Sequence, residues 1–149
     1  MAFDVRPLAA SDRESWLPMW SGYLDFYDVS AEKRNPSDTW RRLVDRDHIY
    51  GLGAFSDSGE LVGITHYLFH ADTWTPDPAC YLQDLFTRAD VRGQGVGRAL
   101  IAGVVADAKA RRCSRVYWMT GTENEVAMKL YDTVASLVPF AIYELDLTD

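Results

Sequence analysis

A glycine-rich stretch flanked by arginines, Arg92-Gly93-Gln94-Gly95-Val96-Gly97-Arg98, has the composition of a phosphate-binding loop. It stands where an apolar run at 81–87, typical of a strand, meets apolar residues at the spacing of one helical face. Glycines there let the backbone approach a ligand, and the first helical turn offers unpaired N–H groups and the positive end of the dipole. The stretch lacks the Gly-Lys-Ser/Thr ending of a Walker loop. It predicts a phosphate cradle of another kind, or else a turn that only packs the helix on the strand.

A second chemical candidate, Asp84, lies in the middle of the apolar run before this loop. Burial raises the pKa of a carboxyl, which would suit Asp84 to accept a proton. The alternative is a structural carboxylate that accepts hydrogen bonds. Its neighbour Gln83 can face the same side only where the strand bulges, because successive strand residues face opposite sides.

The elements around these residues follow from the apolar spacing and the turn signals. Asp57-Ser58-Gly59 separates two apolar runs and predicts a β-hairpin. Ser11 or Asp12 begins a helix with aromatic residues at helical spacing, and Asn124 caps the last helix. We expect strands at 3–6, 49–56, 60–69, 80–87, 115–120 and 140–147, and further helices at 37–45, 94–111 and 125–136.

This order predicts an α/β fold of one domain, residues 1–149, in which a hairpin-rich first half leads into one parallel βαβ unit. The sheet is mixed and has helices on both faces. A chain of 149 residues with 48% hydrophobic content can bury one core of its own.

Composition excludes several classes of function. The net charge of −7 argues against general nucleic-acid binding and suits a cationic substrate better. No run of about 20 apolar residues could span a membrane, and the first residues lack a signal-peptide pattern, so we expect a cytoplasmic protein. Cys80 and Cys113 have no metal-ligand or disulfide-exchange spacing, which predicts reduced thiols and no metal site.

The pattern Arg92-x-x-Gly95-x-Gly97 after a strand, with Asn124 and Tyr131 downstream, resembles the GNAT superfamily of acetyl-CoA-dependent N-acetyltransferases. The resemblance covers nearly the whole chain. Segments 81–86 and 91–97 are most similar to the branch with diamine, polyamine and histone-type acetyltransferases. The resemblance to this superfamily implies a mostly antiparallel sheet, acetyl-CoA as cosubstrate, no metal and a homodimer.

The same resemblance assigns roles to individual residues. Tyr131 is the general acid that protonates the coenzyme A thiolate, and Asn124 binds pantetheine or a water beside the base. Where diamine acetyltransferases have a glutamate that handles the amine proton, this chain has Gln83, which binds an amine but cannot deprotonate it. The base therefore stays open between Asp84 and a water relay. The predicted acetyl-CoA site comprises Leu85, Phe86, Thr87, Arg92, Gly93, Gln94, Gly95, Val96, Gly97, Arg98 and Asn124.

An acceptor groove is expected near the end of the first helix, because aromatic faces attract ammonium groups. The alternative is an aromatic stripe that belongs to the core, as we expect for Trp16 and Trp20. His66 and His70 follow nearby and are expected to be hydrogen-bonded structural residues. The predicted acceptor-binding residues are Tyr23, Tyr27, Trp74 and Gln83.

These interpretations predict an N-acetyltransferase that acetylates a primary amine of a diamine, polyamine or amino acid by direct transfer in a ternary complex. Neither cysteine lies in a nucleophile motif, so no covalent intermediate is expected. The alternatives are a protein lysine or N-terminal acetyltransferase, an aminoglycoside acetyltransferase, and a noncatalytic acyl-CoA sensor. A sensor would need the phosphate loop but neither Tyr131 nor Asp84.

Overall fold

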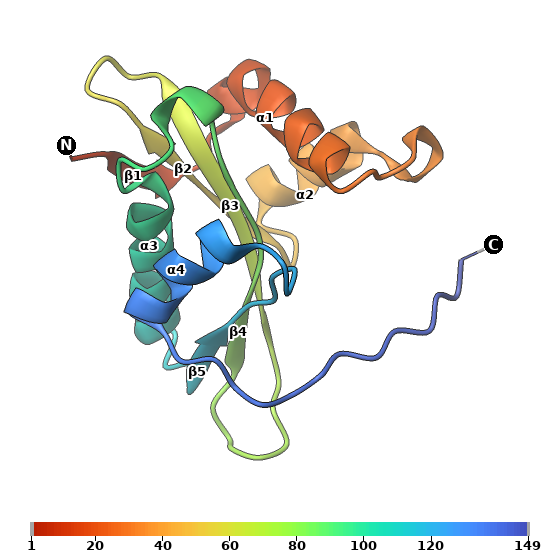
Figure 1. The fold of residues 1–149 in the computed structure, drawn as a ribbon. Coiled ribbons are helices and arrows are strands. Elements are labelled where there is room, and N and C mark those ends of the chain that lie inside the picture. Colours follow the sequence, from red (N-terminus) through yellow and green to blue (C-terminus); the bar gives the residue numbers. More distant parts are fainter. Residues whose placement is uncertain (1, 149) are drawn as a thin grey trace. The chain divides into compact units, whose positions relative to one another are not determined.

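The computed structural model describes residues 2–148 (Figure 1). The chain divides into two compact units, Met1–Met119 and Thr120–Asp149. Within the described residues, no helix is both long and apolar enough to cross a membrane. The expectation that residues 1–149 act as one domain stays a prediction.

The first unit contains one sheet, whose strands are β1 (Asp4–Pro7), β2 (Tyr50–Phe55), β3 (Leu61–His70), β4 (Ala79–Thr87) and β5 (Arg115–Tyr117). They lie side by side in chain order. All neighbours pair antiparallel except β4 and β5, which pair in parallel. Helix α3 (Val96–Ala110) connects these two strands. The prediction of a mostly antiparallel sheet with one βαβ unit is confirmed.

Helices cover both faces of this sheet, as alternation along β2 shows. A side chain at Gly51 would meet Leu43 of α2 (Pro36–Asp45), whereas the next residue, Leu52, lies against Gly103 of α3. Helix α1 (Arg13–Phe26) lies on the same face as α2 (Figure 1). Its Trp16 contacts both Trp40 of α2 and His66 of β3. The expected two-sided arrangement is confirmed.

The core on the α1–α2 face is rich in large aromatic and aliphatic side chains. Trp16 is completely buried and its ring centroid lies 4.9 Å from that of Trp40. The core interpretation of this aromatic is therefore correct. The buried members of the cluster are Leu8, Trp16, Met19, Trp40, Leu43, Phe55, Leu61 and Ile64.

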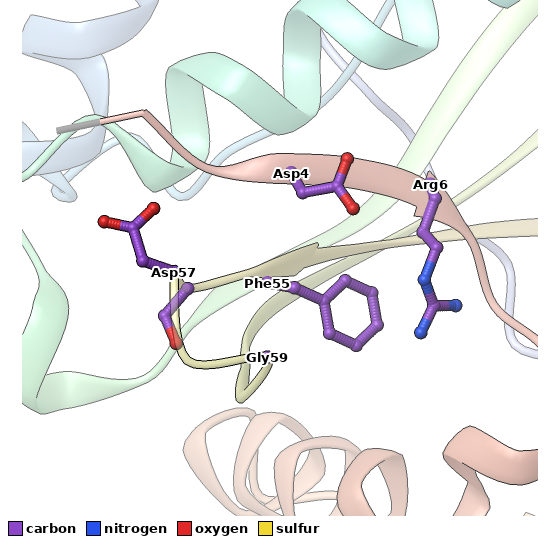
Figure 2. Close-up of a pocket in the computed structure, with 6 residues that line it drawn as sticks. Asp4, Arg6, Phe55, Asp57 and Gly59 are labelled. Carbon is purple, nitrogen blue, oxygen red and sulfur yellow. The ribbon is translucent and has the colours of Figure 1, made fainter.

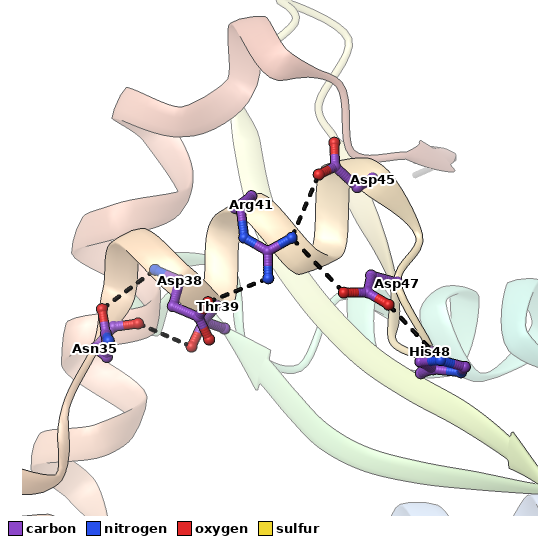
Figure 3. Close-up of polar contacts among 7 residues, drawn as sticks. All are labelled: Asn35, Asp38, Thr39, Arg41, Asp45, Asp47 and His48. Carbon is purple, nitrogen blue, oxygen red and sulfur yellow. Dashed lines mark hydrogen bonds and ion pairs between the residues drawn. The ribbon is translucent and has the colours of Figure 1, made fainter.

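Local polar contacts fix the ends of α2 (Figure 3). The Asn35 side chain accepts a hydrogen bond from the backbone N–H of Asp38 at 3.2 Å, and Pro36 occupies the first turn, where its missing N–H costs nothing. Arg41 forms ion pairs with Asp38, Asp45 and Asp47. These carboxylates are exposed and already paired, so they stabilise the helix surface modestly.

The second unit contains α4 (Glu125–Val134), with the predicted cap: the Asn124 side chain accepts a hydrogen bond from the backbone N–H of Ala127 at 3.2 Å. The predicted strand at 140–147 is wrong, because the structure has no strand there. A strand needs a partner for its backbone N–H and C=O groups, and an alternating pattern does not supply one. The apolar side chains of this segment are exposed at Phe140, Ile142, Tyr143, Leu145 and Leu147.

Candidate active site

A β-bulge in the middle of β4 shapes the region of the predicted acceptor residues. Tyr67 of β3 pairs with Leu82, but the preceding His66 pairs with Asp84, so Gln83 has no partner across the two strands. The bulge places Asp84 opposite His66 and leaves Gln83 exposed. The sequence allowed Gln83 and Asp84 a common side only if the strand bulged, and it does.

The Asp84 carboxylate belongs to a mostly buried polar network. Its Oδ2 lies 3.0 Å from Nδ1 of His66, and the indole N–H of Trp16 donates to Nε2 of the same ring at 3.0 Å. His66 is thus the hydrogen-bonded residue that the sequence predicted. The Asp84 side chain retains 14% of its exposure, which leaves it reachable from solvent.

An aromatic wall on α1 stands beside this carboxylate. The Tyr23 ring lies 5.5 Å from Trp20, 4.9 Å from Tyr27 and 6.2 Å from Phe86 of β4, centroid to centroid. Burial raises the pKa of the Tyr23 hydroxyl, and the charge of Asp84 and a hydrogen bond with it raise it further. Tyr27 is 51% exposed. Aromatic faces next to a carboxylate form an environment that attracts an ammonium group.

Trp74 does not lie beside this wall in the structure. It is 89% exposed, in the loop that joins the end of β3 to the start of β4. This loop ends at Ala79, the first residue of β4, and Asp84 comes five residues later. About 17 Å of extended strand therefore separates Asp84 from the end of the loop. Of the predicted acceptor residues, the structure therefore groups Tyr23 with Tyr27 near Asp84 and Gln83, and leaves Trp74 apart.

The C-terminal half of β4 has an open backbone edge. Its ladder with β5 covers only the residues up to the pair Tyr81 and Tyr117. Beyond Tyr81, residues 82 and 84–87 remain paired to β3, but their other edge has no ladder partner among the described strands. Leu85, Phe86 and Thr87 lie on this stretch. Such an edge can pair with an extended amide-containing ligand in the manner of an added strand.

The glycine-rich loop follows directly after this edge. Gly93 and Gly95 have φ of +80° and +91°, which favour glycine, and a Cβ built at either position would meet nothing within 4 Å. Gly95 precedes α3, and its carbonyl accepts the first helical hydrogen bond, from Ala99 at 3.0 Å. Amides ahead of Ala99 therefore lack a helical acceptor and can bind anionic oxygen. Arg92 ties the loop to β4 through a 3.1 Å hydrogen bond to the Thr87 carbonyl.

The remaining loop residues differ in what they can offer a ligand. Val96 is buried, and its side chain occupies the space beside Gly63, so only its backbone faces the loop. Gln94 and Arg98 are exposed, and Gly97 is half-buried. The structure thus keeps the predicted loop contiguous from residue 92 to 98.

Asn124 and Tyr131 lie in the second unit, Asn124 as the N-cap residue of α4 and Tyr131 within the helix, seven residues later. The Oδ1 atom of Asn124 is engaged in the helix cap. Their roles toward acetyl-CoA stay predictions.

The two cysteines are poor nucleophiles. Burial raises the pKa of the Cys80 thiol to about 12, and burial also raises the pKa of Cys113. The thiolate is the reactive form of cysteine, and the raised pKa of each thiol disfavours that form near neutral pH. Across residues 2–148, the structure places no three metal-ligating side chains together.

A surface hollow of about 410 Å³ lies elsewhere, between β1 and the turn after β2 (Figure 2). None of the predicted site residues lines it. Its cation, Arg6, already pairs with Asp12 at 2.8 Å and lies 3.9 Å from the centre of the Phe55 ring. The pKa of Asp12 is lowered mainly by the hydrogen bond from Arg6. This hollow is a structural feature of the sheet edge.

Residues 13–134 match the Acetyltransferase (GNAT) family. The chain belongs to this family. It is an N-acetyltransferase, for which the family implies acetyl-CoA as the donor. Over 142 residues it is 30% identical to the D-amino-acid N-acetyltransferase HPA3 of Saccharomyces cerevisiae, covering 94% of this chain and 88% of the relative.

Two further likenesses agree with this assignment. This acetyltransferase is 23% identical over 132 residues to the thialysine N-epsilon-acetyltransferase of Caenorhabditis elegans, covering 89% of this chain and 81% of the relative. The crystal structure of ribosomal-protein-alanine N-acetyltransferase from Brucella melitensis biovar Abortus 2308 superposes with a TM-score of 0.80 at 24% identity, covering 99% and 100% of the two chains. The latter shows a common fold.

The sequence prediction missed the link between Trp16 and His66. The two residues are 50 positions apart, and only the fold brings the indole onto the imidazole. The sequence did hold one signal that Trp16 lies near the site: Trp16 and Tyr23, a predicted acceptor residue, are seven residues apart on one helix and therefore face the same way.

Proposed function

We propose that this enzyme transfers an acetyl group from acetyl-CoA to a primary amine of a small molecule, a diamine, polyamine or amino acid, directly within a ternary complex. The observation that carries the proposal is the Asp84 carboxylate at the bulge, beside the aromatic wall of Tyr23 and Tyr27. The names of the two relatives support it, since D-amino acids and thialysine are small amines.

Acetyl-CoA, the acetyl donor, fits the C-terminal end of β4 and the glycine-rich loop that follows it. The backbone amides at the start of α3 and the Arg92 side chain would hold the pyrophosphate, and the open edge at Leu85–Thr87 would pair with the pantetheine amides. The left-handed glycines, Gly93 and Gly95, keep this cradle free of side chains.

The acceptor needs a free electron pair on nitrogen. An alkyl ammonium has a pKa near 10 in water, and the aromatic wall lowers it by desolvation. Asp84 takes the proton, directly or through a water held by Gln83. The nitrogen pair then attacks the thioester carbonyl carbon, and the C–S bond breaks with its electrons on sulfur. Tyr131 gives its hydroxyl proton to the sulfur, which completes free coenzyme A, and takes in exchange the second proton that the amide nitrogen loses.

Direct transfer also agrees with the state of the cysteines. A covalent acetyl-enzyme would require a reactive thiolate, and the raised pKa values of Cys80 and Cys113 oppose one.

The test is release of free coenzyme A from acetyl-CoA across a panel of diamines, polyamines, D- and L-amino acids, aminoglycosides and lysine peptides. We expect release with small amines. Release with lysine peptides alone would indicate a protein acetyltransferase. Binding of acetyl-CoA without release with any amine would favour the sensor.

We also propose a homodimer in which residues 140–147 of one copy pair with a sheet edge of the other. The support is the exposed, alternating apolar side chains of this segment. Sedimentation of the purified chain should give a dimer that Leu145→Asp converts to a monomer, while the neighbouring Glu144→Gln leaves it intact. A wild-type monomer at micromolar concentration would contradict the proposal.

A further inference from the structure

Three elements contribute to the network behind Asp84. Trp16 comes from α1, His66 from β3 and Asp84 from β4. Trp16 is completely buried, and the side chains of His66 and Asp84 are 6% and 14% exposed. The network therefore runs from the core to the edge of the proposed acceptor site.

The hydrogen-bonding partners of His66 fix which of its two ring nitrogens carries the proton. An indole nitrogen only donates, so Nε2 of His66 must present its lone pair to Trp16. A doubly protonated ring would set two N–H groups against each other in the core. The proton of the neutral ring is therefore on Nδ1, which donates to Oδ2 of Asp84 across 3.0 Å.

The groups facing His66 agree with this assignment. Trp16 and Trp20 of α1 cover the ring, with Trp20 edge-on at 4.9 Å between centroids. Asp84 of β4 is its charged neighbour, and the Tyr23 hydroxyl of α1 faces that same carboxylate. The Asp84 carboxylate thus has the His66 Nδ1–H on one side and the Tyr23 hydroxyl beside it.

We propose that Trp16 and His66 are positioning residues for Asp84. Trp16 holds His66 as the Nδ1–H tautomer, and the Nδ1–H of His66 holds the carboxylate in place, aimed at the acceptor amine. This inference rests on the proposed function, in which Asp84 is the base.

One consequence separates this arrangement from a proton-relaying His–Asp pair. Nε2 is committed to the indole, so His66 cannot receive a second proton without losing the Trp16 hydrogen bond. A proton taken from the amine therefore stays on Asp84 and leaves outward to solvent. The bulge is essential, because it is what sets Asp84 opposite His66.

The tautomer is tested by NMR of the ¹⁵N-histidine-labelled enzyme at about pH 8, above the usual pKa of histidine. The chain has three histidines, and the His66→Asn variant identifies the His66 signals. We expect a protonated Nδ1 and an unprotonated Nε2. A proton on Nε2 would overturn the proposal whatever the activity of the enzyme.

The positioning role is tested by two substitutions of the same residue. His66→Ala removes the donor to Asp84, whereas the side-chain amide of His66→Asn can replace it. We expect kcat to fall about 10- to 100-fold in His66→Ala and to recover at least several-fold in His66→Asn, with an unchanged Kd for acetyl-CoA. Equal losses in both folded variants, or full activity in His66→Ala, would overturn the proposal.

The two experiments also separate the possible failures. If the wild-type enzyme releases no coenzyme A with any amine, the proposed function fails and the positioning role fails with it. The tautomer spectrum still decides, in that case, whether Trp16 fixes the His66 proton.

Discussion

The proposed donor and acceptor sides of β4 differ in the kind of group that forms them. The donor side is an exposed loop made mainly of backbone, in which left-handed glycines and the start of α3 supply the N–H groups. The acceptor side is made of side chains, with Asp84 held by buried partners from two other elements. A site made of backbone can be recognised in the sequence as a run of contiguous residues, whereas a site made of side chains from several elements forms only when the chain folds.

Replacement of the proposed base, on the acceptor side, should have the largest effect on turnover. Asp84→Asn removes the proton acceptor, and we expect kcat to fall roughly 10²- to 10⁴-fold with an unchanged Kd for acetyl-CoA. The matched control is Asp107→Asn, because Asp107 is another partly buried carboxylate, which accepts a hydrogen bond from the Tyr67 hydroxyl at 2.7 Å but lies outside the site. Steady-state kinetics and calorimetric titration measure the two quantities. Near-normal turnover in Asp84→Asn would transfer the base role to a water relay.

The proposed acid should give the next largest effect. Tyr131→Phe removes the hydroxyl that protonates the thiolate, and we expect kcat to fall about 10- to 100-fold at constant acetyl-CoA affinity. Tyr143→Phe, at an exposed tyrosine of the same unit, serves as the control. A loss of acetyl-CoA affinity with unchanged turnover would refute the assignment of Tyr131 as acid.

Acetyl-CoA binding on the donor side can be weakened separately, by a substitution that strains the backbone of the glycine-rich loop. Alanine at Gly95 would adopt a φ of +91°, which costs about 1–2 kcal/mol, so we expect acetyl-CoA binding to weaken about tenfold. Gly59→Ala is the control, because Gly59 has a φ of +84° and equally open surroundings in a hairpin turn. Both variants should lose similar thermal stability. Equal acetyl-CoA affinity in both would contradict the phosphate-loop role.

The smallest effect is expected at the aromatic wall. Loss of one exposed cation–π partner is worth about 0.5–1 kcal/mol, so Tyr27→Ala should raise KM for the amine about two- to fivefold. Trp74→Ala should leave KM unchanged, because the structure places Trp74 at the far end of β4. The reverse result would support the acceptor role that the sequence predicted for Trp74.

The sequence predicted the elements whose signals are local. The hairpin turn at Asp57–Gly59, the Asn124 cap and the glycine loop each depend on residues a few positions apart. The structure confirmed the parallel pair of the βαβ unit, because one helix directly joins two strands that follow each other in the chain.

Features that depend on distant partners escaped prediction. No local signal located the bulge at Gln83, and the Trp16–His66 hydrogen bond joins residues that only the packed fold brings together. The predicted final strand failed because alternation at 140–147 specifies a face but provides no neighbouring strand.

The central claim, direct transfer of acetyl to a small amine, is tested most directly by initial velocities of coenzyme A release. The best amine from the panel and acetyl-CoA are varied together. A ternary complex predicts double-reciprocal lines that intersect. Parallel lines would indicate a covalent acetyl-enzyme and would contradict the account.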